Sequence, residues 1–193
     1  MTARRVKNEA PRATDPELMV RLASGEIGAL GELYDRYHEP LRRFLGCATG
    51  GAEDVDDLVH QTFLAAAKSA QRYDGRPSCR PWLMGIAAQH LRRRRQALAR
   101  LFAVLGSLRL GRTSSIDPRP TLHAWTDVER ALAAISEPKR IAFLMAEVEG
   151  CTCAEIADAL RIPIGTVWTR LHAARRELRQ ALGGPDPHAE AGE

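Results

Sequence analysis

The sequence lacks long apolar runs, and it contains few aromatic residues and only four cysteines. No stretch approaches the ~18–20 apolar residues that a membrane-spanning helix needs. The positive charges near the N-terminus are not followed by an apolar core, so a secretory signal is not expected. Four cysteines in 193 residues provide no disulfide framework. We therefore expect a cytoplasmic protein whose cysteines are free thiols.

Residue patterns typical of catalysis are also missing. The six histidines stand at no metal-ligand spacing from a cysteine, and no glycine-rich phosphate-binding loop occurs. Cys151 and Cys153 form the one suggestive pair, because a C-x-C arrangement can bind a soft metal or sense oxidants. A free cysteine is equally suited to a small position in a core. We predict no enzyme activity, no cofactor, no metal site and no small-molecule substrate.

Charge is distributed unevenly along the chain. Lysine and arginine number 28 against 24 acidic residues, and 25 of the 28 are arginine, an excess that codon bias alone also produces. Residues 53–57 carry four acids, whereas Arg92 to Arg95 form an unbroken basic run. Residues 161–179 carry five arginines against one acid. Such segregation suits a protein that contacts nucleic acid with some surfaces and protein with others.

Apolar residues recur at helical spacing throughout, while strand patterns are nearly absent, so the predicted fold class is all-α with two helical domains. The predicted divisions are a disordered arm (1–14), a first helical block (15–100), a flexible linker (101–124), a second helical block (125–182) and a disordered tail (183–193). Asp15 is predicted to cap the first helix, and Pro40 to kink or break the second.

The second block contains a predicted helix-turn-helix. Thr152 and Glu155 have the form of a capping box, and the helix that they open must end before Pro163. A new helix begins around Ile164 and turns an apolar face inward. Its outward face holds Thr166, Thr169, Arg170, His172, Arg175, Arg176 and Arg179. Such a pair of helices places the second one in a DNA major groove, although a solvated amphipathic helix would show a similar charged face.

The segment from Gly150 to Leu171 resembles region 4 of the extracytoplasmic-function (ECF) group of bacterial sigma factors, in the sigma-70 family. The resemblance implies docking on the β flap of RNA polymerase and recognition of the promoter −35 element. The implied −35 contacts are Thr166, Trp168, Thr169, Arg170, His172, Arg175 and Arg176. Trp168 stands where the family usually has Lys or Arg, and Ala173 replaces a frequent Arg. Weaker or differently specific −35 binding is therefore expected.

The first block resembles region 2 of the same family. The helix from Glu53 is similar to the one that binds the β′ clamp of core polymerase, which implies this role for Asp54, Asp57, Leu58 and Gln61. Acids at that place also simply stabilise a helix start. The segment from Arg72 onward resembles the part that melts and reads the −10 element, which implies DNA contacts by Tyr73, Arg76, Arg80, Gln89, His90, Arg92 and Arg93. Gly85 stands where the family often has Arg, and Trp82 is predicted to lie in the core.

The two resemblances predict a sigma factor that binds core RNA polymerase, directs initiation at promoters with −35 and −10 elements, and is regulated by an anti-sigma factor. It would associate with the nucleoid, or with the membrane through the anti-sigma factor. Two alternatives remain open. One is a sigma-like decoy that binds an anti-sigma factor without initiating transcription. The other is a redox- or metal-responsive regulator that acts through Cys151 and Cys153.

Overall fold

The computed structural model describes residues 13–51, 54–108 and 127–183, and these residues form helices and turns without any strand. The first block contains α1 (Asp15–Ala23), α2 (Ile27–Thr49), α3 (Val55–Ser69), the 3₁₀ turn η1 (Ala70–Arg72) and α4 (Arg80–Leu108). The second contains α5 (Asp127–Ala134), α6 (Glu137–Phe143), the π-helical turn η2 (Leu144–Val148), α7 (Cys153–Leu160) and α8 (Ile164–Ala181). The predicted all-α fold class is confirmed. None of the described helices has the length and apolar character that crossing a membrane requires.

Two expectations about the first block need correction. Thr14, not Asp15, caps α1, because its hydroxyl accepts from the Glu17 amide while the Glu17 carboxylate accepts from the Thr14 amide. Of the two outcomes predicted for Pro40, a break is wrong, because α2 continues through the proline. Leu41 and Tyr37 on either side of the proline are buried in the core, and this packing outweighs the backbone hydrogen bond that proline cannot make.

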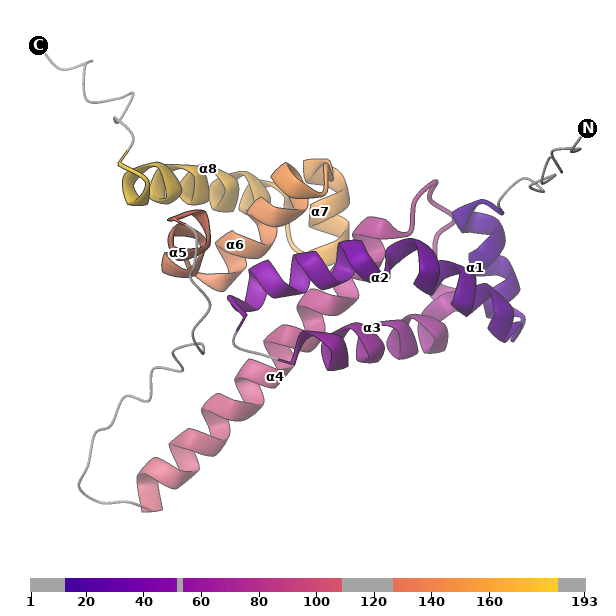
Figure 1. The fold of residues 1–193 in the computed structure, drawn as a ribbon, viewed down its shortest axis with the longest axis horizontal. Coiled ribbons are helices and arrows are strands. Elements are labelled where there is room, and N and C mark those ends of the chain that lie inside the picture. Colours follow the sequence, from indigo (N-terminus) through magenta and orange to yellow (C-terminus); the bar gives the residue numbers. More distant parts are fainter. Residues whose placement is uncertain (1–12, 52–53, 109–126, 184–193) are drawn as a thin grey trace, which may run out of the picture.

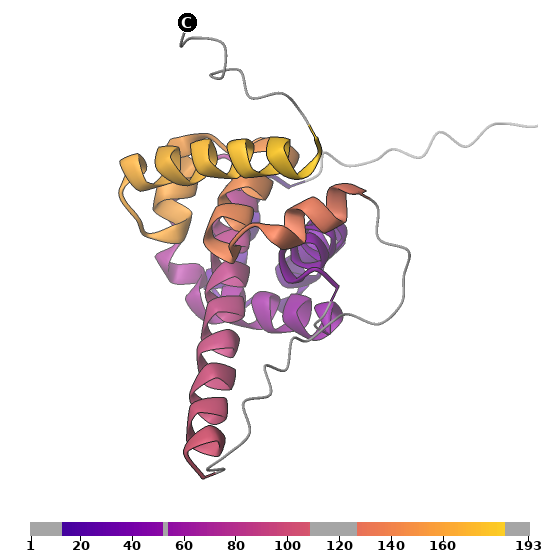
Figure 2. The ribbon, with the colours of Figure 1, turned by 90° about the vertical axis from the view of Figure 1, so that its left-hand side faces the viewer.

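The predicted linker is shorter at its beginning than expected. Helix α4 continues to Leu108, so residues 101–108 are helical. This stretch contains three leucines and no proline, and leucine readily extends a helix that has already formed. The second half of α4 projects away from the other helices (Figures 1 and 2). The rest of the linker (109–124) lies outside the described residues, as do 1–12 of the arm and 184–193 of the tail.

The helix-turn-helix of the second block is confirmed as α7 and α8. The Thr152 hydroxyl accepts from the Glu155 amide, and the Glu155 carboxylate accepts from the Thr152 amide at 2.8 Å. Arg161 ends α7 in the left-handed conformation, with φ at 55°, and α8 begins directly after Pro163. The inward face of α8 is buried as predicted, through Val167, Leu171, Ala174 and Leu178.

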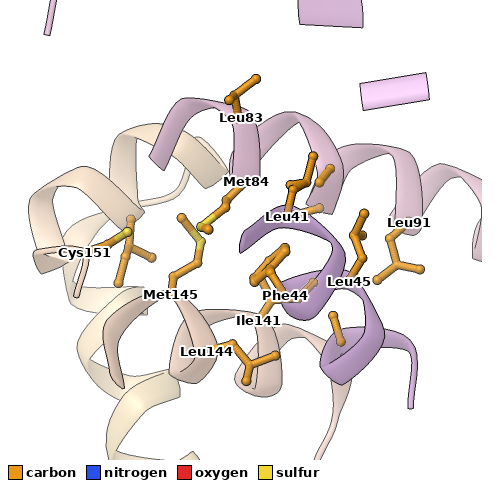
Figure 3. Close-up of a cluster of buried hydrophobic side chains, with 14 of the residues drawn as sticks. Leu41, Phe44, Leu45, Leu83, Met84, Leu91, Ile141, Leu144, Met145 and Cys151 are labelled. Atoms are coloured by element: carbon orange, nitrogen blue, oxygen red, sulfur yellow. The ribbon is translucent and has the colours of Figure 1, made fainter. Parts of the chain in front are cut away.

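The two blocks share one core instead of standing apart. Leu41 and Phe44 of α2 and Met84 of α4 meet Ile141 of α6 and Met145 of η2, and all five side chains are buried (Figure 3). The helix α4 packs along α7 beside this cluster (Figure 2). This contact could not be predicted from the sequence, because helical periodicity shows which face of a helix is buried but not what buries it.

A glycine allows α4 and α7 to touch at the backbone. A Cβ atom on Gly85 would lie 2.4 Å from the carbonyl oxygen of Ala159, far inside van der Waals contact. Any other residue at position 85 therefore forces the two helices apart.

Candidate nucleic-acid interface

The outward face of α8 is largely open to solvent. Thr169, His172, Arg175 and Arg176 are exposed, whereas Thr166 and Arg170 are half-buried. The Thr169 hydroxyl donates to the carbonyl oxygen of Gly165 at 2.9 Å, which leaves its oxygen free to accept. Arg175 forms an ion pair with Glu147 of η2 at 2.5 Å. Six of the predicted −35 residues thus reach solvent at least in part, on one helix.

Trp168 also lies on the accessible surface of α8. Its side chain is 59% exposed, and that of Ile164, one helical turn earlier, is 42% exposed. These are the large apolar side chains of a helix face whose other exposed residues are mostly polar or basic.

The loop before α4 is anchored by a buried carboxylate. Asp15 of α1 accepts from the Cys79 amide at 2.7 Å, and it also binds the Tyr37 hydroxyl and the Arg36 guanidinium. Burial and the bond to Asp15 raise the pKa of Tyr37 to about 12. The sequence analysis assigned Asp15 only a helix-end role, since no local pattern indicates a partner 64 positions away.

Tyr73 is held in place at the start of this loop. Its hydroxyl donates to the Arg76 carbonyl oxygen at 2.6 Å, and burial raises its pKa well above the ordinary value. The ring meets Trp82 edge to face with centroids 5.3 Å apart. Trp82 is half-buried and packs against the core, as predicted. Tyr73 is therefore oriented by its own loop and by α4.

Two predicted −10 arginines bind the second block instead of facing solvent freely. Arg76 pairs with Asp158 of α7 at 2.8 Å and with Asp74 of its own loop at 2.6 Å. Arg80 lies 3.6 Å from the carboxylate of Glu149, which follows η2 and whose pKa is raised by burial. These pairs place the predicted −10 surface against the second block.

The −10 and −35 residues also meet in a small cavity between the blocks. Gln89 and Arg92 of α4 line it together with Arg170 of α8, and its volume is about 80 Å³. Burial, and then the nearby charge of Arg92, lower the pKa of Arg170. Next to them, burial and the charge of Arg93 lower the pKa of His90. Two arginines that were assigned to different DNA elements therefore line the same cavity.

The candidate polymerase-binding face of α3 is mostly exposed. Asp54, Asp57 and Gln61 are exposed, and the Gln61 amide donates to Asp57 at 2.7 Å. Asp54 also caps the helix by accepting from the Asp57 amide at 3.3 Å. Leu58 is only 1% exposed and packs in the core, as helical spacing predicts, so its implied contact with polymerase stays a prediction. It is an inward position of an amphipathic helix.

The cysteines are placed as packing residues. Cys79 and Cys151 are buried, and burial raises the pKa of each thiol to about 12. Cys153 and Cys47 are half-buried and pack against the core. Among the described residues, no group of three or more His, Cys, Asp or Glu side chains is arranged to hold a metal ion. A buried thiol with a raised pKa reacts slowly, which argues against a sensor role for Cys151.

Comparison with known proteins defines the class first. Residues 33–101 match the family model of sigma-70 region 2, and residues 126–178 match that of sigma-70 region 4. The fold agrees with solved sigma factors. Sigma factor RpoE from Bartonella quintana, in complex with the anti-sigma factor NepR, has a TM-score of 0.65 at 18% identity and covers 79% of this chain and 96% of its own. CnrH, in complex with the cytosolic domain of CnrY, has a TM-score of 0.60 at 23% identity over 88% of this chain and 97% of its own.

The particular family follows from curated relatives. ECF RNA polymerase sigma factor SigM of Mycobacterium tuberculosis (strain ATCC 25618 / H37Rv) is 30% identical over 175 residues, covering 88% of this chain and 85% of SigM. SigL of the same species (strain ATCC 35801 / TMC 107 / Erdman) is 31% identical over 164 residues, 83% of this chain and 92% of SigL. The chain therefore belongs to the ECF family of RNA polymerase sigma factors, a family of transcription initiation factors.

Proposed function

We propose that this sigma factor reads the −35 element with α8 and the −10 element with the loop before α4 and the first half of α4. The exposed basic face of the helix-turn-helix carries this proposal, because helix N-termini and arginines so placed bind the major groove. The proposed −35 contacts are Thr166, Trp168, Thr169, Arg170, His172, Arg175 and Arg176, and the proposed −10 contacts are Tyr73, Arg76, Arg80, Gln89, His90, Arg92 and Arg93. The chain contributes binding and no catalytic step.

The proposal requires the two blocks to separate. The −10 and −35 elements lie about 25 base pairs apart, or roughly 85 Å at ~3.4 Å per base pair. Arg76 and Asp158, one from each block, are 2.8 Å apart here. The packed arrangement therefore cannot contact both elements at once, and binding to core polymerase must favour an open one.

Regulation by an anti-sigma factor is part of the proposal. RpoE and CnrH, which have the same fold, were solved in complex with NepR and with the cytosolic domain of CnrY. An inhibitor that binds the packed arrangement better than the open one would shift the population away from promoters. The sigma factor would then lie at the nucleoid when active, and wherever its inhibitor lies when inactive.

Run-off transcription with core polymerase and the purified protein tests the central claim. Removing two arginines from α8, by Arg170→Ala together with Arg175→Ala, should reduce promoter-dependent product while core binding stays intact. Each phosphate contact that is lost should lower the salt slope of DNA binding by about 1. Arg130→Ala is the matched control, since Arg130 is an exposed arginine of α5. Absence of promoter-dependent product from the wild type, with tight anti-sigma binding, would favour the decoy.

The polymerase-binding face is tested separately. Asp57→Ala should weaken pull-down of the β′ clamp, because it removes an exposed acid from the centre of the α3 surface. Asp127→Ala removes an exposed acid from the second block and should leave the pull-down unchanged. Equal retention of both variants would mean that the α3 acids only stabilise the helix start.

A further inference from the structure

The recognition helix α8 carries an exposed apolar pair near its N-terminus. Ile164 is its first residue and Trp168 its fifth, and they lie on one side of the helix because they are one turn apart. Their side chains are 42% and 59% exposed. Neither is needed to close the core of the second block, which uses Val167, Leu171, Ala174 and Leu178 instead.

The surroundings of this pair favour a polyanion as its partner. The exposed residues around it on α8 include Thr169, Arg175 and Arg176, all polar or basic. Glu177 is the one acid of the helix, and it is paired with Lys139 at 2.7 Å. Arg175 and Arg176 lie two turns further along the helix, and Arg175 is paired with Glu147. A helix with an apolar pair at its start and arginines further along complements a groove that has anionic walls and an apolar feature on its floor.

We propose that Trp168 and Ile164 contact thymine 5-methyl groups in the major groove and thereby set the −35 preference of this sigma factor. The inference rests on the proposed function and specifies what the helix reads. Residues at the start of a recognition helix reach base edges, and the thymine methyl is the apolar group that the major groove presents. Trp168 carries no charge, so it adds sequence preference without adding a phosphate contact.

The experiment uses wild-type protein bound to core polymerase. A −35 sequence is first selected from a randomised duplex library, and each thymine in it is then replaced by uracil, which removes only the methyl group. Binding should fall about three- to fivefold at one or two positions, the factor that burial of one methyl-sized group provides. In Trp168→Ala the uracil effect should disappear at the position that the tryptophan contacts, while the salt slope of binding stays that of the wild type.

Two further variants sharpen the test. Trp168→Arg should shift the selected base at the contacted position towards guanine, because arginine pairs with the N7 and O6 atoms of guanine. Val20→Ala truncates an apolar side chain of α1 that is 71% exposed, and it should keep the uracil effect. Circular dichroism should show that each variant folds. We expect the Trp168 variants to fold because this side chain is exposed and outside the core.

The outcomes separate the inference from the proposed function. If wild-type holoenzyme selects no sequence, both fail. If it selects a −35 sequence but uracil has no effect, or the same effect in Trp168→Ala, the methyl contact is refuted while the proposed function stands. Unchanged DNA binding by Trp168→Ala together with lost anti-sigma binding would assign the tryptophan to a protein interface and overturn the inference.

Discussion

The two candidate DNA surfaces differ in how far the packed arrangement covers them. On α8, Thr169, His172 and Arg176 remain exposed. In the first block, Arg76 and Arg80 bind acids of the second block instead. The same closed arrangement thus leaves much of the −35 surface accessible while it covers the centre of the −10 surface.

The difference has a physical origin in the contact between the blocks. Its apolar part, around Phe44, Met84 and Met145, brings the first half of α4 against α7 and η2. The α4 residues next to this patch are the ones assigned to the −10 element, whereas most of the α8 face points the other way. Access to the −10 surface is therefore coupled to separation of the blocks, and access to the −35 surface is coupled less strongly.

Gly85→Leu is expected to have the largest effect on how far the −10 surface is covered. A side chain at this position meets the Ala159 backbone, and overpacking of this kind costs about 1–3 kcal/mol. The ratio of closed to open molecules should fall by roughly 5- to 150-fold. Small-angle scattering should then report a larger radius of gyration, and binding to single-stranded −10 DNA should rise.

Gly31→Leu is the matched control for this substitution. Gly31 lies inside α2, and a Cβ atom there meets nothing within 4 Å. Both substitutions raise helix propensity by a similar amount, so only the one at position 85 tests the interface. An unchanged radius of gyration for Gly85→Leu would mean that the blocks do not pack this way in solution.

A smaller effect is expected from Arg140→Met. The buried guanidinium of Arg140 donates to the carbonyl oxygens of Ala48 and Ile135, each at 3.1 Å, and so ties α6 to the end of α2. Its Nε atom has no partner, and burial lowers its pKa, so methionine removes a buried-charge penalty as well as two bonds. Stability should fall by about 1–2 kcal/mol.

Urea denaturation of the full chain measures this change, with Arg130→Met as its control. Arg130 is exposed on α5, and its substitution should stay within about 0.5 kcal/mol of wild type. A stable Arg140→Met variant would show that the two carbonyl groups find water once the guanidinium is gone.

Local signals explain what could be predicted from the sequence. The start of α7 follows from Thr152 and Glu155, and the boundary between α7 and α8 follows from Pro163, each of which acts within a few positions of itself. The buried faces of α3 and α8 follow from helical spacing in the same way. The outward placement of Asp54, Asp57 and Gln61 could be predicted for this reason, and so could the inward placement of Leu58.

Long-range contacts explain what could not be predicted. Arg76 and Asp158 are 82 positions apart, and nothing near either residue indicates the other. The sequence indicates only that Gly85 stands where the family often has Arg. That it lets α4 approach the backbone of Ala159 depends on a residue far along the chain. The predicted start of the linker was wrong for a different reason. The end of a helix is poorly marked in the sequence when it has no proline or cap.

The smallest expected effect comes from the ion pair between Arg76 and Asp158. Their side chains are 31% and 62% exposed, so solvent screens the pair, and its removal by Asp158→Ala should cost at most about 1 kcal/mol. The ratio of closed to open molecules should therefore fall no more than about fivefold, and less at high salt. Arg76 keeps its bond to Asp74 in this variant, so its loop should keep its shape.

A double-mutant cycle with Arg76→Ala, read by small-angle scattering at low and high salt, measures the coupling directly. A coupling energy above that of an exposed pair would mean that the contact between the blocks excludes more water than the exposure of these side chains implies. The −10 surface would then be covered more tightly.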